Sequence, residues 1–434
     1  MAVGGSALSR SSAINRLKRV YAPRAIQAYD FSTPFFSQIP KRFNLDGERF
    51  EQTLVLSGGA GAGTTSTGDV PVAGRRREGK AYYYPTENLS SIKITRAMLN
   101  IGKGENYIGN SAADDEISRG VERLKDNTER MLIDGSVNAL GQIKNSAATD
   151  IVYNGSYSYT LKLVSSTFVE ANFEEEDLVN IGSGSTGLWK IQEVDPDEAN
   201  LGANPTITVV FERGIPSVPA LNDFIYKQGS QNSGIFGLRE MLSISAGSAY
   251  GFNLTRRWSA GYYIASYGQG PSTGLLDNMF RACHRKTGKV PTAIICSYEV
   301  HDAFKSLLEG QDRYAMTDVT PRFNIDGKWS ADYKKMSRLG QFGWKAMAYD
   351  TALSPAPVPF FISKFLRRGE LMALNLSDPA MLSLDHASGF GWMDEDGDTW
   401  AREPGKTNFS AVYGGEMQSW ICLPYHAYVN GISV

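Results

Sequence analysis

The sequence predicts an α+β protein that carries a β-rich insertion. Three features indicate this class: one long amphipathic helix that stands alone, two strands that flank a flexible stretch, and a later region in which short strands and helices alternate. Hydrophobic residues make up 42% of the 434 positions and charged residues 21%, as in ordinary globular proteins, which excludes a wholly disordered chain.

The first 45 residues predict an arm that lies against another surface. The segment holds seven basic residues against Asp30 alone, a net charge of about +6 by this count, within a chain whose net charge is -2. Its aromatic residues indicate that it packs on its own core or on a neighbouring chain. Prolines at 23, 34 and 40 exclude one long helix.

Residues 46–100 predict an extended hairpin whose strands are 49–56 and 90–99. Between these strands, Ser57 to Gly68 consists only of Gly, Ala, Ser and Thr, and three consecutive arginines follow at 75–77. A protruding two-stranded arm cannot bury its own surface. We therefore expect it to be disordered or to lie on a partner.

Residues 101–149 contain the strongest helical pattern, which predicts a helix over 111–143. Apolar residues recur at spacings of three and four, and Asp126 and Arg130 form an opposite-charge pair expected on the solvent side. Gly120 and Gly135 are expected positions for bends.

The rest of the chain divides by composition. Residues 150–230 hold twelve acidic and four basic residues with short alternating strands, so 150–233 predict an acidic antiparallel β insertion. Residues 234–376 predict an α/β unit with helices at 273–287 and 298–309 around a strand at 291–296. Residues 377–434 predict strands that return to the body of the molecule.

Several motifs fail the test of spacing, and the sequence predicts no catalytic, cofactor-binding or metal-binding residue. Gly182–Gly187 matches the letters of a dinucleotide fingerprint, but a strand rather than a helix is predicted to follow it. Asp394–Asp398 lacks the glycine and the final carboxylate of a calcium loop. Cys283 and Cys296 fall on apolar faces, which favours core positions over a zinc site with the nearby histidines.

Overall charge and cysteine content narrow the functional classes. Lys and Arg number 44 against 46 Asp and Glu, so no overall basic excess indicates nucleic-acid binding. Three widely spaced cysteines form no disulfide framework and fit a reducing compartment. No apolar run reaches the roughly 18 residues of a membrane span, so no membrane partner is expected.

The order of these parts resembles the major capsid proteins of tailed bacteriophages with the Hong Kong 97 fold. The strands 49–56 and 90–99 look like that family's E-loop, and the helix 111–143 looks like the spine helix of its P-domain. Residues 237–258 and 273–309 are similar to the lead into its A-domain, and 377–434 would return to the P- and A-domains. Residues 150–233 depart from the minimal pattern and look like an addition.

The resemblance implies a structural protein, not an enzyme, that assembles into pentamers and hexamers of an icosahedral shell around double-stranded DNA. A separate scaffolding protein, a portal and a decoration protein are the implied further partners. The implied location is the virion, after assembly in the host cytoplasm. Two alternatives stay open: an encapsulin-type shell around protein cargo, and a soluble α/β enzyme with a cleft within 237–385.

One contact between subunits is predicted from charge. Arg75, Arg76 and Arg77 are expected to rest on acidic surface of an adjacent subunit, for which Asp114, Asp115 and Glu116 at the start of the long helix are the candidates. The alternative is that the three arginines are merely solvated.

Overall fold

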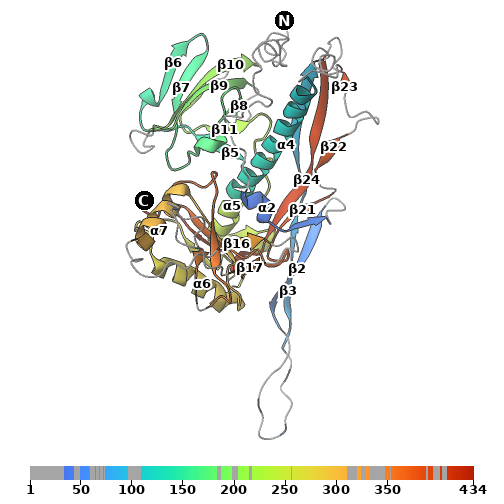
Figure 1. Ribbon diagram of the computed structural model, residues 1–434, viewed down its shortest axis with the longest axis vertical. Coiled ribbons are helices and arrows are strands. Elements are labelled where there is room, and N and C mark those ends of the chain that lie inside the picture. The colour runs from blue at the N-terminus through green and yellow to red at the C-terminus, as the bar shows by residue number, and fades with distance from the viewer. Residues whose placement is uncertain are drawn as a thin grey trace.

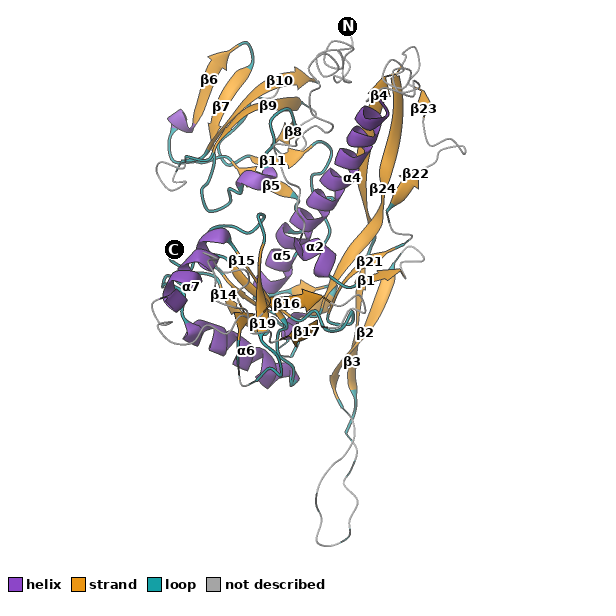
Figure 2. Cartoon of the chain, in the orientation of Figure 1, coloured by secondary structure: helices purple, strands orange, loops and turns teal. Residues whose placement is uncertain are grey.

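The computed structural model shows an elongated molecule in which a long helix and a long sheet join an α/β body, a separate β module and a projecting hairpin (Figure 1). The structure describes residues 34–43, 49–58, 64, 68, 72, 74–95, 109–182, 187–197, 204–214, 218–255, 257–309, 320–323, 329–332, 348–351, 353–387, 390–393, 401–402 and 408–434. Strands dominate this part of the chain (Figure 2).

The long sheet has β24 (Asn408–Ile421) at its centre. This strand pairs antiparallel with β4 (Thr86–Thr95) over ten residue pairs and with β21 (Leu382–His386) beside it. β1 (Lys41–Phe43) lies parallel to β21 at one edge. Two short strands, β22 (Gly391–Met393) and β23 (Ala401–Arg402), also pair with β24. The returning strands predicted within 377–434 are therefore present.

The hairpin forms with a different partner from the one predicted. β2 (Phe50–Ser57) pairs antiparallel with β3 (Arg77–Tyr83), whereas the predicted partner, 90–99, supplies most of β4 in the long sheet. The pairing of 49–56 with 90–99 was therefore wrong. Both hairpin strands project from the body at one end of the molecule (Figure 1). The residues between them lie largely outside those that the structure describes.

The long helix, α4 (Gly109–Asp134), is shorter than predicted and ends just before Gly135 instead of at residue 143. The Gly135 N–H donates to the Met131 carbonyl at 3.0 Å, and Gly135 has a φ of +123°, which only glycine adopts without strain. Residues predicted to continue the helix form the strand β5 (Ala139–Gln142) instead. At about 1.5 Å per residue, α4 spans about 39 Å.

α4 packs along β4. Gly120, which was expected to bend the helix, instead lies where the helix approaches the strand. A Cβ on Gly120 would lie 2.6 Å from the Ile92 side chain, so glycine permits the close approach of helix and strand. Asp126 and Arg130, predicted to face solvent, are 7% and 1% exposed, so that prediction was wrong. Asp126 pairs with Lys364 at 2.7 Å, and Arg130 donates to Asn127 at 2.9 Å.

The β module is antiparallel, as predicted. It is a seven-stranded sheet with its own core, and its strand β5 lies before residue 150, outside the predicted bounds. Trp189 and Leu140 are among the side chains buried in that core. The strand order is β5, β11 (Phe224–Lys227), β8 (Leu178–Ile181), β9 (Leu188–Asp195), β10 (Thr206–Arg213), β7 (Ser158–Lys162) and β6 (Ile151–Gly155).

The α/β body is built on a six-stranded mixed sheet. Its order is β14 (Tyr262–Ile264), β25 (Ala427–Val429), β20 (Leu371–Leu374), β15 (Ala293–Cys296), β19 (Val358–Ile362) and β18 (Ala348–Tyr349). The predicted helices are confirmed as α6 (Thr273–Thr287), which Gly288 ends with a φ of +74°, and α7 (Tyr298–Glu309). Ile294 points toward these helices and Ile295 toward the opposite, main core.

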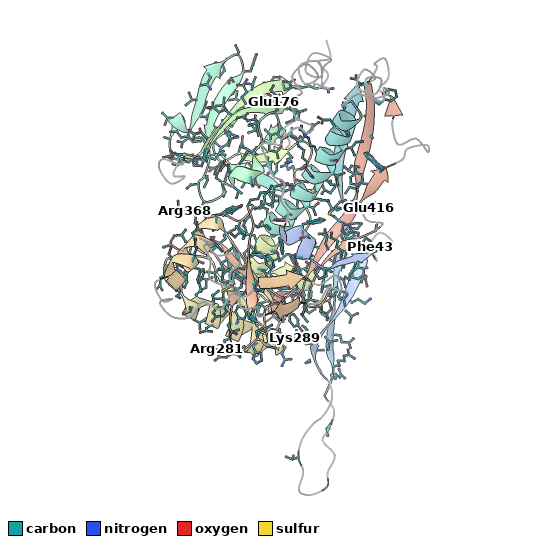
Figure 3. The ribbon with its side chains drawn as sticks, in the orientation of Figure 1. Phe43, Glu176, Arg281, Lys289, Arg368 and Glu416 are labelled. Carbon is teal, nitrogen blue, oxygen red and sulfur yellow. The ribbon has the colours of Figure 1, made fainter. Side chains whose placement is uncertain are left out.

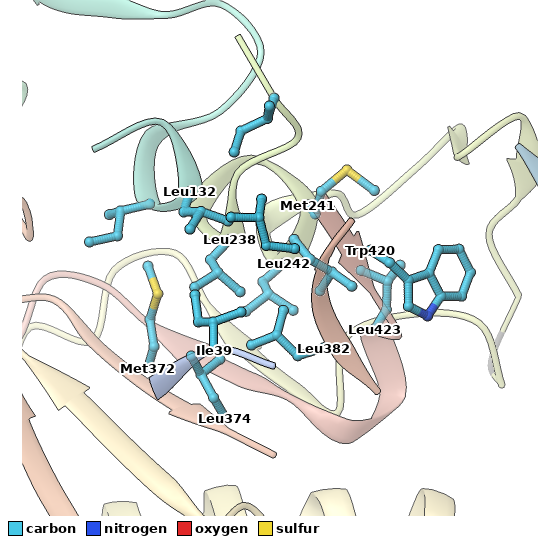
Figure 4. Packing of buried hydrophobic residues seen from close by; sticks show 14 of the residues in the cluster. Ile39, Leu132, Leu238, Met241, Leu242, Met372, Leu374, Leu382, Trp420 and Leu423 are labelled. Carbon is cyan, nitrogen blue, oxygen red and sulfur yellow. The ribbon is translucent and has the colours of Figure 1, made fainter. Parts of the chain in front are cut away.

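The main core joins the body to the long sheet. Leu132 of α4, Leu238 of α5 (Leu238–Ser243), Leu382 of β21 and Trp420 of β24 meet there (Figure 4). α2 (Pro34–Gln38) covers its edge through Phe35 and Phe36, which are 1% and 4% exposed. The other short strands are β12 (Ser248–Ala249), β13 (Phe252–Asn253), β16 (Thr320–Phe323) and β17 (Trp329–Asp332).

The motifs tested in the sequence can now be located. A strand, β9, follows Gly187, as predicted for a glycine-rich turn. Cys283 and Cys296 are both buried in the core of the α/β body, as predicted. Asp394–Asp398 lies outside the described residues. In the described part of the chain, no helix is both long and apolar enough to cross a membrane.

The buried His426 makes the stability of the body dependent on pH. Its Nδ1 accepts the Asn375 N–H at 3.1 Å, while Nε2 lies 3.0 Å from the Met381 carbonyl, so the neutral ring with a proton on Nε2 satisfies both contacts. A proton on Nδ1 would oppose the Asn375 N–H. Burial lowers the pKa of His426 to about 4, against the smaller opposing effect of the Met381 carbonyl.

We predict that stability falls between about pH 6.5 and about pH 4, and that His426→Gln reduces the fall. The unfolded chain takes up the proton near the ordinary pKa of about 6.5 and the folded chain only near 4, so the contribution is complete above the first value and is lost as the pH drops. The expected difference is about 3 kcal/mol in the free energy of unfolding. Denaturant melts of both proteins across this range measure it.

In the His426→Gln variant, the free energy of unfolding should still fall somewhat between about pH 6.5 and about pH 4, because burial also lowers the pKa of His386 to about 4. Identical pH dependence in the two proteins would contradict the assignment to His426.

Candidate functional site

The candidate site is the root of the projecting hairpin together with the segments that attach there. At the root, β1 places Phe43 at the outer edge of the long sheet, where its ring is 66% exposed and stacks on His386 at 5.7 Å (Figure 3). The Tyr82 N–H donates to the Tyr250 carbonyl at 3.0 Å and joins β3 to the body.

A buried carboxylate, Asp385 of β21, holds the root together. The Arg42 guanidinium donates to both of its oxygens at 2.7 Å in a two-pronged ion pair, and the Tyr83 hydroxyl also donates to it. The Ser383 hydroxyl adds a fourth hydrogen bond at 2.7 Å. Asp385 is 0% exposed, so these donors replace the water that the carboxylate loses. Burial first, and then the Asp385 charge, raises the pKa of Tyr83.

A second buried carboxylate, Glu129 of α4, fixes the segment that leads into β1. Glu129 accepts the Phe36 N–H at 2.9 Å and the Ser363 hydroxyl at 2.8 Å. Phe36 lies in the first turn of α2, where backbone N–H groups have no partner within the helix. Burial raises the pKa of Glu129, while these two hydrogen bonds oppose the rise. α2 is thereby tied to α4 and to the body at once.

A polar crevice lies between the hairpin and the body. Its volume is about 420 Å³, and its lining includes the β2 residues Gln52–Leu56 on one side and Lys286 and Lys289 at the end of α6 on the other. Arg257 bridges the two walls by donating to the Leu56 carbonyl at 3.1 Å. Among the described residues, no group of three or more His, Cys, Asp and Glu is arranged to hold a metal ion.

The predicted arginines lie on the hairpin, away from the body. Arg75, Arg76 and Arg77 are all exposed, and Arg77 is the first residue of β3. Arg76, just before β3, has its Nε 2.5 Å from Glu78 on that strand, with the two side chains 58% and 45% exposed. An ion pair so exposed contributes about 0–1 kcal/mol and leaves the arginines free to change partner.

The predicted acidic partners lie near the start of α4. Glu116 is half-buried and faces Arg119 at 3.9 Å, while the side chains of Asp114 and Asp115 lie outside those that the structure describes. α4 begins at the end of the molecule opposite to the hairpin (Figure 1). One chain therefore does not bring the two groups together, and a contact between copies stays a prediction.

The sequence alone did not identify Asp385 or Glu129 as a buried carboxylate that joins distant segments. Asp385 is 343 residues from Arg42, and Glu129 is 93 residues from Phe36 and 234 from Ser363. The one available signal was charge in an apolar setting: Asp385 stands inside Leu-Ser-Leu-Asp-His, a strand whose five residues are all buried.

We predict that Asp385→Asn releases β1 from the sheet and lowers the free energy of unfolding by about 3 kcal/mol, because Arg42 then loses its counter-charge. Trypsin should cut faster after Lys41 and Arg42, as followed by mass spectrometry. Asp302→Asn is the control, since that side chain is 77% exposed and its loss should cost no more than about 0.5 kcal/mol. Equal cleavage in Asp385→Asn and in the unaltered chain would contradict the proposed anchoring.

Comparison with known proteins identifies solved structures that share this fold. No family model matches the sequence, and no curated protein matches it either. A chain of the cyanophage A-1(L) capsid matches the structure with a TM-score of 0.55 and 11% identity, over 95% of this chain and 96% of that one.

Two weaker similarities accompany it. The capsid of a native GTA particle has a TM-score of 0.46 at 8% identity, covering 98% of this chain and all 100% of that one. The holo-SrpI encapsulin complex of Synechococcus elongatus PCC 7942 has a TM-score of 0.45 at 8% identity, covering 99% and 97%. Over nearly its whole length, the chain shares the fold of a phage capsid protein.

Proposed function

We propose that this chain is a structural capsid protein that assembles with copies of itself into a closed shell. The observation that carries the proposal is the fold shared with the cyanophage A-1(L) capsid chain, which extends over 95% of this protein and so reaches well beyond the α/β body. A similarity confined to the α/β body would not account for the hairpin and the long helix.

The energetics of the hairpin support the same proposal. Along β2, the buried residues are Leu54 and Leu56, and along β3 they are Ala81 and Tyr83. The opposite faces of both strands are exposed, and an isolated two-stranded hairpin is marginally stable in water. A neighbouring subunit that covers these faces would supply the missing burial.

The finer proposal follows the resemblance to the Hong Kong 97 fold. In it, 1–45 is the N-terminal arm, 46–100 the E-loop, 101–149 the spine-helix region of the P-domain, and 234–376 the A-domain. The β module at 150–233 is an addition to that plan, and 377–434 returns to the P- and A-domains. Pentamers and hexamers of the chain would form the icosahedral shell of a tailed phage around double-stranded DNA, with a scaffolding protein, a portal and a decoration protein as further partners.

Electron microscopy of the purified protein, with absorbance at 260 nm recorded on the same particles, tests this function. We expect closed shells, which hold nucleic acid when they come from the virion. Shells filled with protein would favour an encapsulin-type container. A species of 47.5 kDa that never assembles, even with neighbouring genes co-expressed, would contradict shell formation.

The contact between the arginines and the start of α4 gives a separate prediction. Reversing the charge of Arg75, Arg76 and Arg77 to Glu should reduce shell yield, because acidic side chains would then face acidic side chains across the contact. Shell yield is measured by sedimentation and microscopy. Unchanged assembly would mean that the arginines are merely solvated.

A compensating variant makes the test specific to this pair of surfaces. Adding Asp114→Lys, Asp115→Lys and Glu116→Lys to the triple glutamate variant should restore assembly if the two groups meet. Failure to restore it, with the lysine changes alone harmless, would place the partner of the arginines elsewhere.

A further inference from the structure

The outer edge of the β module is open. β6 (Ile151–Gly155) ends the seven-stranded sheet and pairs only with β7 among the strands that the structure describes. In an antiparallel pair, alternate residues direct their N–H and C=O groups away from the partner strand. Val152, Tyr153 and Asn154 of β6 are also exposed in their side chains. The edge therefore offers backbone hydrogen-bonding groups and apolar surface together.

This edge lacks the usual protection against pairing. Exposed edge strands commonly carry lysine, proline or an inward-pointing charge, which discourage another strand from adding to them. The ten residues of the edge hairpin, Ile151 to Thr160, contain no charged residue and no proline. Their sequence, Ile-Val-Tyr-Asn-Gly-Ser-Tyr-Ser-Tyr-Thr, is instead rich in the Tyr, Ser, Gly and Asn that recur in protein-binding surfaces.

The exposed aromatic rings of the edge are supported from below. Tyr153 packs on Tyr159 with ring centres 5.1 Å apart, and Tyr159 packs on the buried Trp189 at 5.5 Å. On the other side, Tyr157 packs on Phe211 at 6.1 Å. Tyr153 and Tyr157 nevertheless stay 60% and 57% exposed. Rings held in place in this way lose little conformational entropy when a partner covers them.

Charge decides which partner fits. Residues 139–227 hold twelve acidic and five basic residues, a net charge of -7, yet the edge hairpin is neutral. A strongly charged partner of either sign would find no opposite charge on this strip. A second copy of the same strip meets it neutral to neutral. A strand that pairs antiparallel with its own copy also generates a two-fold axis, the commonest relation between identical chains.

We propose that β6 pairs antiparallel with β6 of a second copy of this chain about a two-fold axis. The two edge strands complete each other's hydrogen bonds, and the Tyr153 and Tyr157 rings of both copies cover the joint. The inference rests on the proposed function, because an icosahedral shell has the two-fold axes that would relate the two paired strands.

Cysteine cross-linking of the full-length chain tests the pairing. Val152→Cys, Tyr153→Cys and Asn154→Cys are made one at a time, oxidised as particles and run on a non-reducing gel. Strands related by a two-fold axis bring the same residue of both copies within the roughly 4.4–6.8 Å between Cα atoms that a disulfide spans. We expect a disulfide dimer at one of these positions or at two adjacent ones.

The chain offers a matched control. Val137 is 48% exposed and Val152 is 46% exposed, but Val137 precedes β5, at the other end of the sheet order. Val137→Cys should stay monomeric under the same oxidation. The unaltered protein should also stay monomeric, since Cys283 and Cys296 are buried and Cys422 is partly buried.

A second variant places a charge on the edge strand β6. Asn154→Lys, added to whichever cysteine variant cross-links best among positions 152 and 153, should abolish the dimer, because a lysine on an edge strand opposes the addition of another strand. Asn154 is exposed and its side chain donates to Thr160 of β7 at 2.7 Å, also at the surface, so the change should cost the module little, and circular dichroism checks that the fold is retained.

The outcomes separate this inference from the proposed function. Closed shells without any dimer from positions 152–154 would overturn the pairing and leave the shell function standing. A dimer that survives Asn154→Lys, or an adduct with a different protein, would also overturn it. If no shell forms, the same oxidation of the concentrated soluble chain decides the pairing: a dimer supports it, and its absence overturns it.

Discussion

The buried carboxylate of Asp385 is the constraint on which the placement of the projecting parts depends. A carboxylate that is 0% exposed must be matched by donors, because an unpaired buried charge costs several kcal/mol. Its donors come from three separate segments: Arg42 before the hairpin, Tyr83 at the end of β3 and Ser383 on its own strand. None of these segments satisfies the carboxylate alone, so β1, the hairpin and the long sheet must come together in one arrangement. The direction in which the hairpin leaves the body follows from this arrangement.

Local sequence patterns were sufficient to predict those helices and strands in which apolar residues recur at regular spacing along the chain. α6 and α7 were predicted from periodicity and a terminal glycine, and the antiparallel nature of the β module from short alternating strands. The partner of β2 was missed because β3 begins Arg-Glu-Gly-Lys, which hides a strand among charges and a glycine. Gly79 stands there because a Cβ would lie 2.1 Å from the Phe252 ring, a requirement set by a residue 173 positions away.

The errors in α4 have the same origin. The apolar spacing continues beyond Gly135 into Leu140 and Ile143, but those side chains belong to the core of the β module. Asp126 and Arg130 had the spacing of a solvent-exposed pair, and their burial depends on Lys364 and Asn138, which no local pattern identifies as partners. Charge at helical spacing predicts exposure only when nothing packs on that face. Here α4 is covered by β4, α2 and the body together, so buried charges on it had to be matched from distant segments.

The molecule thus combines two kinds of polar surface. Within the chain, charges are buried and held by several donors, as at Asp385 and Glu129, so each projecting part starts from a fixed position. On the surfaces that we assign to contacts between copies, groups are exposed, as at Arg76 and the β6 edge. Weak contacts suffice in a closed assembly, because each contact after the first forms at the high effective concentration that the existing ones impose. A neutral five-residue edge can therefore pair weakly between isolated chains, where oxidation at high concentration still traps the dimer, and pair firmly within a shell. The buried anchors and the weak contacts are connected. A projecting part that is already held in one position loses less conformational entropy when it contacts a neighbour, so a weak contact is enough.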